Sequence, residues 1–291
     1  MLLTDTHNGD RDGEDPRGRA LGHALREARV DKGLTTRELG ARLKRDHGVV
    51  SRWETGERTA KPEQVAQILT VLGVDGDRYD EIIALSYAPD ESNWVATTLP
   101  AQRQQLSAYV DIEEKATKIV QISPLLIPGL LQTDDYVRAV MSGGGIPTGE
   151  IATRVAIRIG RRAVLQRTEL SEFVALVGEA ALYQQVGGRD VMKEQLRHLI
   201  AVANEPKVNL RIVPFSAGWH PALEGPFVIV ESKQSNPVVQ LESRTSSLLL
   251  HENTDVAAYR RAADKVSQVA MSHTDTIGII EQVARKVERS Q

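Results

Sequence analysis

The sequence predicts two domains of different fold class, an all-α domain at the N-terminus and an α+β domain at the C-terminus. The chain has 291 residues, which is enough for two separate hydrophobic cores. Residues 18–88 carry apolar side chains at helical spacing, divided by capping residues and glycines. Residues 111–291 mix helical stripes with short β-branched runs, most of which come late in the chain. This grouping of strands favours an α+β domain.

The chain begins with a polar, acid-rich stretch at residues 1–17. It has too few apolar side chains to offset the entropy lost on ordering, so we expect a disordered tail. From residue 18 to residue 30, Leu21 and Leu25 recur at helical spacing, and Gly33 ends the pattern. These features predict the first helix of the N-terminal domain.

A second, shorter helix is predicted directly after it. Thr35 or Thr36 can cap its start, and Leu39 and Leu43 lie four residues apart on one side. The pattern breaks around Lys44 and Arg45, so a tight turn is expected there.

A third helix is predicted from Asp46, a good N-cap residue, to Gly56, a typical helix stop. Val50 and Trp53 recur at i and i+3 and should face the core. The opposite side of this helix presents small, polar and basic side chains that suit entry into a DNA major groove. They are His47, Gly48, Val49, Ser51 and Arg52.

Positive charge is concentrated around these helices. Residues 19–61 hold eleven basic and six acidic side chains, a balance of +5, so the rest of the chain sums to −8 although the whole carries −3. A local positive potential attracts phosphate groups. A solvated basic face would give the same count, but together with the helix pair it favours a nucleic-acid surface.

Two more helices complete the predicted domain. Pro62 suits a first helical turn, and a stripe of Val65, Ile68, Leu69 and Leu72 follows it. After Gly73, a fifth helix is predicted at residues 77–87. We expect the domain to span residues 18–88, with a linker at 89–110 and the second domain at 111–291.

The motif A-x-L at 41–43 and V-S-R-W-E-T-G at 50–56 resembles the helix-turn-helix of Xre and lambda-repressor regulators. The resemblance implies an ion pair between Arg29 and Glu54 and a DNA-binding face. His47-Gly48 stands where family members often carry Gln-Ser, so the base preference of the family does not carry over to this chain. The expected contacts to phosphates or bases are Thr36, Arg37, Lys44, Arg45, His47, Gly48, Val49, Ser51, Arg52, Thr55 and Arg58.

The second domain is predicted from alternating patterns. Short apolar or β-branched runs lie at 116–123 and 124–127, and strands are expected at 172–177, 208–213, 226–231, 238–241 and 247–250. Helices are expected near 133–141, 148–168, 179–186, 191–203, 256–271 and 274–287. The helix at 148–168 carries a row of arginines, which suits contact with DNA flanks or an acidic partner but is also typical of a solvated helix face.

Several residues of the second domain suit ligand or partner contact. They are Glu179 and Glu242, which follow predicted strands, and Trp219 and His220 in a Gly- and Pro-rich loop. Surface, packing or ion-pair roles are the more common explanation for such residues. No motif of a hydrolase or of a nucleotide-dependent enzyme occurs, so we expect no enzymatic activity, no metal site and no cofactor.

The amino-acid composition excludes several classes of protein and site. Cysteine is absent, so a disulfide scaffold, a thiolate metal site and a cysteine nucleophile are excluded. The sequence has no apolar run of about 18 residues or more, and no charged-then-apolar start. We therefore expect no membrane span, no secretory signal and a cytoplasmic location.

A second resemblance covers the chain from about residue 108 to its end. The ordered blocks IPGLLQTDDYVRAV, RRAVLQR, LVGEAALYQQVGG, EQLRHL, LRIVPFSAGWHPALEGPF and VVQLE resemble a poorly characterised domain that follows Xre-type heads in actinobacterial regulators. This implies a homodimeric transcriptional regulator that binds a double-stranded DNA operator. Two alternatives stay open: an antitoxin-like module that binds a small companion protein and regulates its own operon, and a C-terminal domain that binds or converts a small-molecule effector.

Overall fold

The computed structural model describes residues 16–86, 93–96, 99–244 and 246–289. These residues form two compact units, the first reaching to Tyr109 with Arg244–Leu249 added, and the second made of Val110–Ser243 and Leu250 onward. Most of the predicted disordered tail and part of the predicted linker lie outside the described residues. Pro16 and Arg17, which we assigned to the tail, already belong to the first helix.

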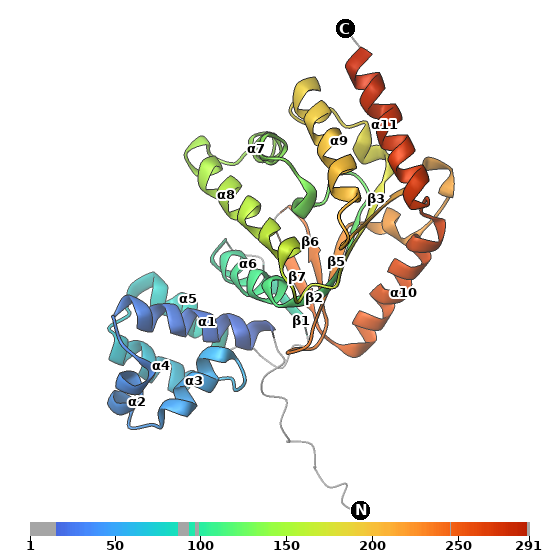
Figure 1. Cartoon of the computed structure of the whole chain (residues 1–291). Coiled ribbons are helices and arrows are strands. Elements are labelled where there is room, and N and C mark those ends of the chain that lie inside the picture. The colour runs from blue at the N-terminus through green and yellow to red at the C-terminus, as the bar shows by residue number, and fades with distance from the viewer. Residues whose placement is uncertain (1–15, 87–92, 97–98, 245, 290–291) are drawn as a thin grey trace, which may run out of the picture. The chain divides into compact units, whose positions relative to one another are not determined.

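Residues 16–86 of the first unit form five helices, as the sequence predicts (Figure 1). They are α1 (Pro16–Asp31), α2 (Thr36–Leu43), α3 (His47–Thr55), α4 (Pro62–Leu72) and α5 (Gly76–Ser86). We call these helices the head. Its core consists of the predicted apolar stripes, because the side chains that recur at helical spacing are the ones that lie inside. They are Leu21, Leu25, Leu39, Leu43, Val50, Trp53, Val65, Ile68, Leu69, Leu72, Ile82 and Leu85.

Local capping chemistry sets the helix ends. Thr35 caps α2 in a reciprocal pair with Glu38, and the hydrogen bonds from Thr35 lower the pKa of the Glu38 carboxyl. The turn after α2 is made by Lys44, whose backbone is left-handed at φ 54°. Asp46 then caps α3 by accepting a hydrogen bond from the backbone N–H of Gly48. The ends of α2 and α3 therefore follow from local capping, whereas Lys44 between them adopts a backbone conformation that a lysine rarely takes.

Gly22 allows α1 and α3 to approach closely. A Cβ atom at this position would lie 2.6 Å from the carbonyl oxygen of Trp53 and 2.8 Å from that of Glu54. Gly22→Ala should therefore push the helices apart and destabilise the head by about 1–3 kcal/mol. Faster amide hydrogen exchange in α1 and α3 would show this. Gly278→Ala is the matched control, since nothing lies within 4 Å of the Cβ it would add; wild-type exchange in Gly22→Ala would refute the close contact.

The second unit is built around a mixed sheet. Its strands are β2 (Ala116–Ser123), β3 (Glu172–Gly178), β4 (Val208–Val213), β5 (Phe227–Ser232) and β6 (Val238–Glu242), in the order β6-β5-β2-β3-β4. Strands β2, β3 and β4 run parallel, while β5 is antiparallel to both β2 and β6. The carboxyl ends of β2, β3 and β4 therefore meet at one edge, which we call the carboxyl edge.

Helices surround this sheet, with α7 and α8 to one side of it and α10 to the other (Figure 1). The strands β1 (Asn93–Ala96) and β7 (Ser247–Leu250) are neighbours. The remaining helices are α6 (Leu99–Glu114), α7 (Asp134–Gly143), α8 (Thr148–Gly160), α9 (Arg189–Ala203), α10 (Asn253–Val269) and α11 (His273–Arg289). Short 3-10 turns are η1 (Gly129–Leu131), η2 (Arg161–Gln166), η3 (Glu179–Leu182), η4 (Phe215–Ala217) and η5 (Pro221–Glu224).

The prediction of one helix at 148–168 was too long. The α-helix ends at Gly160, and the chain continues as the 3-10 turn η2. The tighter turn places Arg161 against Glu113 of α6 and buries Val164. Similarly, only the 3-10 turn η3 forms where a short helix was predicted at 179–186.

Candidate nucleic-acid interface

The candidate interface is the outer face of α3, which the head holds from behind. Val50 and Trp53 are only 1% and 4% exposed, so the inner side of this nine-residue helix is embedded in the core. Burying two such side chains stabilises the position of the helix by several kcal/mol. The outer side remains free to contact a partner molecule.

An ion pair also fixes α3 to α1, as the resemblance implied. Nε of Arg29 donates to Oε1 of Glu54 and Nη2 donates to Oε2, both at 2.7 Å. Nη1 of Arg29 donates to the carbonyl oxygen of Leu34, so the same guanidinium also holds the chain just before α2. The hydrogen bonds with Glu54 raise the pKa of Arg29 further, so the guanidinium stays charged. This fork geometry sets the orientation of α3 as well as its distance from α1.

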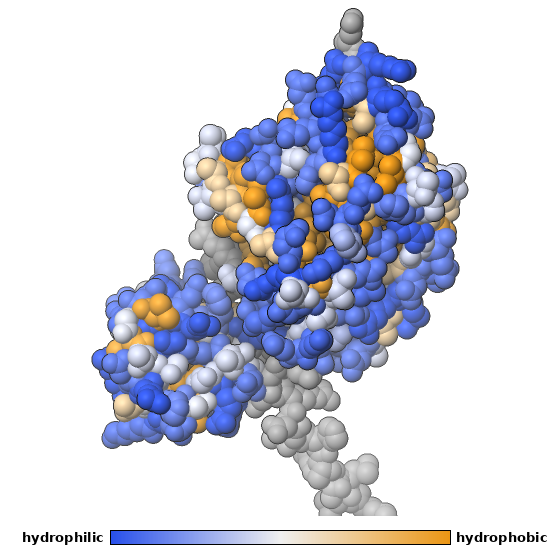
Figure 2. All heavy atoms as spheres, in the orientation of Figure 1, coloured by the Kyte–Doolittle hydropathy of each residue, from blue (hydrophilic) through white to orange (hydrophobic). Residues whose placement is uncertain are grey.

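None of the eleven predicted contact residues is buried. Thr36, Gly48 and Val49 are partly covered. The others are exposed: Arg37, Lys44, Arg45, His47, Ser51, Arg52, Thr55 and Arg58. They come from the start of α2, the turn after it, α3 and the segment that follows. The visible face of the head is mostly hydrophilic (Figure 2).

The N-terminus of α3 is capped by a carboxylate of the chain itself. Backbone N–H groups at a helix N-terminus carry partial positive charge. Asp46 uses one carboxylate oxygen to cap Gly48, and its other oxygen lies 3.5 Å from Nδ1 of His47. A Cβ at Gly48 would meet the capping oxygen at 2.8 Å, so glycine leaves the cap undisturbed.

Most arginines of the row after residue 150 pair with groups of the chain itself. Arg154 pairs with Glu150, Arg161 with Glu113 and Arg162 with Asp134. These contacts satisfy charges that the sequence alone presented as a uniform basic stripe. Arg167 likewise donates to the carbonyl oxygen of Glu114.

The four candidate ligand residues of the second unit take different places. Glu179 accepts hydrogen bonds from the backbone N–H of Phe215 and, at 3.4 Å, from the hydroxyl of Tyr183. Trp219 is 69% exposed, whereas its neighbour His220 is 7% exposed. Glu242 is exposed at the end of β6. Since β6 and β3 are three strand positions apart, about 14 Å at ordinary strand spacing, the two carboxylates do not form one site.

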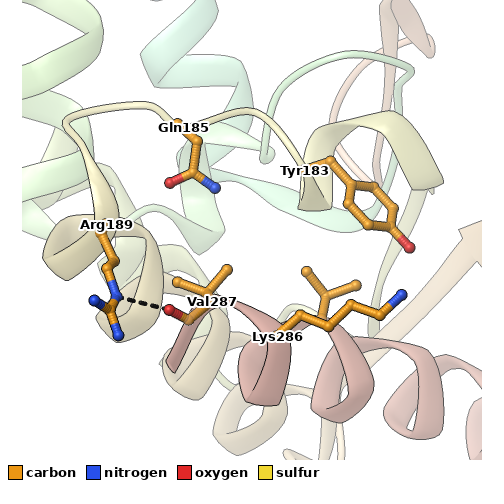
Figure 3. A pocket seen from close by; sticks show the side chains of 6 residues that line it. Tyr183, Gln185, Arg189, Lys286 and Val287 are labelled. Atoms are coloured by element: carbon orange, nitrogen blue, oxygen red, sulfur yellow. Dashed lines mark hydrogen bonds between the residues drawn. The ribbon is translucent and has the colours of Figure 1, made fainter. Parts of the chain in front are cut away.

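A half-open hollow in the second unit was not predicted from sequence. Figure 3 shows it between the chain after η3, the start of α9 and the end of α11. Nε of Arg189 donates to the carbonyl oxygen of Val287 at 2.7 Å, and Nη2 donates to that of Glu288. The lining residues are Tyr183, Gln185, Arg189, Val283, Lys286 and Val287. No local signal marks them because they are brought together from segments about a hundred residues apart.

Two features are absent from the described part of the chain. No group of three or more His, Asp or Glu side chains there could hold a metal ion. None of its helices combines the length and the apolar character that crossing a bilayer requires.

Comparison with protein families matches both parts of this architecture. Residues 20–82 match a family described as a helix-turn-helix domain. Residues 106–282, more than half of the chain, match a family described as a domain of unknown function, DUF5753. No curated protein matches the chain. The chain therefore belongs to the DUF5753 family, and it carries a DNA-binding helix-turn-helix head of the kind found in transcription regulators.

Proposed function

We propose that this protein is a sequence-specific transcriptional regulator of the Xre type that reads the DNA major groove with α3. The observation that carries the proposal is the contrast between the two sides of α3. Its inner side is fixed by Val50, Trp53 and the Arg29–Glu54 pair, while its outer side is open. A rigid helix with a free polar face can enter the groove in a defined register.

Side chains around α3 have separate roles in this proposal. His47, Val49 and Arg52 face the base edges, where an arginine is best suited to guanine. Arg37, Lys44 and Arg45 surround them and contact phosphates, which fixes the register. The local balance of +5 over residues 19–61 supplies the long-range attraction.

The DUF5753 domain controls the head in this proposal, by joining two copies and by responding to a partner or effector, without catalysis of its own. A pair of heads can bind two half-sites about one helical turn apart, which raises affinity and selectivity. Its candidate carboxylates support a non-catalytic role, because Glu179 is engaged with Phe215 and Tyr183 and lies far from Glu242.

Arg52→Ala should weaken operator binding about ten- to a hundredfold, because it removes one base contact from the centre of the interface. Target sites would first be selected from random duplexes with the full-length protein, and affinity measured by fluorescence anisotropy. Arg78→Ala is the matched control, since Arg78 lies on α5 and pairs with Asp31. We expect its affinity to stay within about twofold of the wild type.

Salt provides a second measurement in the same assay. Affinity should fall steeply between low and moderate salt, because phosphate contacts release counterions from DNA. Failure to enrich any sequence, unchanged affinity in Arg52→Ala or salt-independent binding would each contradict the proposal.

A further inference from the structure

Exposed apolar side chains gather at the carboxyl edge of the sheet. Ten large hydrophobic residues are exposed among the residues that the structure describes, and six of them follow the ends of β2, β3 and β4. Large exposed apolar groups collected in one region mark an interaction surface. The six are Leu125, Leu126, Tyr183, Phe215, Trp219 and Leu223.

The loops at this edge contact one another, and these contacts fix the positions of the exposed side chains. The backbone of Pro124 packs directly against Gly178, because a Cβ atom added to Gly178 would lie 2.2 Å from the carbonyl oxygen of Pro124. The carboxylate of Glu179 accepts the N–H of Phe215 at 2.9 Å. The rings of Tyr183 and Phe215 stack with centroids 6.1 Å apart. Phe215 nevertheless remains 67% exposed.

The hollow lies directly beside this aromatic projection, because Tyr183 both stacks on Phe215 and lines the hollow. Its volume is about 240 Å³. A dry cavity of about 150 Å³ is enough to hold benzene, so the hollow can accept a phenylalanine ring. Val283 and Val287 supply apolar walls, and Figure 2 shows hydrophobic residues between α9 and α11.

We propose that this surface binds a second copy of the chain, with Phe215 of each copy inserted into the hollow of the other. A two-fold interface must be self-complementary, so it needs a projection and a matching recess on the same face. Phe215 and the hollow meet that requirement. The inference rests on the proposed function, which calls for two heads on one operator.

Charge supports a second copy as the occupant. Residues 110–291 carry twenty-one basic and twenty-one acidic side chains, so two copies of this part do not repel each other overall. Within the hollow the charged groups are Lys286 and Arg189, both cations. A cation over the face of an inserted aromatic ring is a favourable partner, whereas an inserted cation would be repelled.

The test is a charge swap in the full-length protein without DNA. Wild-type protein should sediment as a dimer, and Phe215→Lys should weaken dimerisation about a hundredfold, since it removes an aromatic anchor and opposes Lys286. The double variant Phe215→Lys/Lys286→Glu should recover dimers, because each new lysine meets a glutamate. Both residues are exposed, so folding should be preserved, and circular dichroism would verify it. Ile157→Lys on α8 is the control for an exposed apolar residue elsewhere.

Each result has a defined meaning. A monomeric wild type, a Phe215→Lys variant that stays dimeric, or a double variant that stays monomeric would overturn the inference. So would an Ile157→Lys variant that dissociates as Phe215→Lys does. Operator binding by the monomeric variant at reduced affinity would leave the proposed function standing even if the proposed interface is wrong. Absence of operator binding in the wild type and in every variant would count against the proposed function itself.

Discussion

Glu54→Ala should destabilise the head by about 3–5 kcal/mol, because it leaves the guanidinium of Arg29 buried without its counter-charge. The two side chains are only 11% and 7% exposed, so water cannot replace the lost partner. The hydrogen bond from Arg29 to Leu34 remains but satisfies a single donor. The loss should also loosen α3 and reduce operator affinity.

Amide hydrogen exchange of the full-length chain is the appropriate measurement, because a two-domain protein has no single unfolding temperature. Exchange should accelerate in α1 and α3 and stay unchanged in the sheet of the second unit. The control Arg29→Met/Glu54→Leu removes both charges together and should recover much of the stability. Wild-type protection in Glu54→Ala would show that the pair does not hold α3.

Glu113→Ala should have an effect of similar size, about 3–5 kcal/mol, on the second unit. Both carboxylate oxygens of Glu113 accept hydrogen bonds from Arg161, at 2.7 and 2.8 Å, and Glu113 is 3% exposed in its side chain. Arg158 lies in the same electrostatic environment. Burial lowers the pKa of Arg158, while Glu242 and Glu113 raise it and Arg161 lowers it. Removing Glu113 therefore leaves two neighbouring guanidinium groups with less compensating charge.

Hydrogen exchange across α6, α8 and η2 would measure this loss. Glu150→Ala is the matched control, because Glu150 also pairs with an arginine but both side chains are more than 40% exposed. An exposed helical pair of this kind contributes about 0.3–0.5 kcal/mol. Equal effects of the two substitutions would contradict the role assigned to Glu113.

The head could be predicted from sequence because its structure depends on local signals. Thr35 and Asp46 cap their helices through residues two or three positions away, and Gly56 ends α3 with a left-handed backbone. The stripe from Val65 to Leu72 sets the buried side of α4. The exposed outer face of α3 then follows from periodicity, since the side opposite Val50 and Trp53 must face outward.

The second unit depends more on contacts between distant segments. Most of its strands and helices lie where apolar patterns place them, and their mixture indicated α+β. Strand order could not be predicted, because β5 pairs with β2 across about a hundred residues and no local residue signals that partner. The partners of the arginine row could not be predicted from sequence either, because Arg161 and Glu113, for example, are 48 residues apart.

Sequence by itself determined the class of each domain, the five helices of the head and the side of α3 that is free. These features arise from contacts within a few residues, where spacing and capping chemistry decide the conformation. Only the tertiary structure decided which charges are paired, which loops share the carboxyl edge and that Phe215 stands beside a hollow built from η3, α9 and α11. Those features depend on long-range packing, because the way the whole domain buries its apolar surface determines which distant segments come into contact.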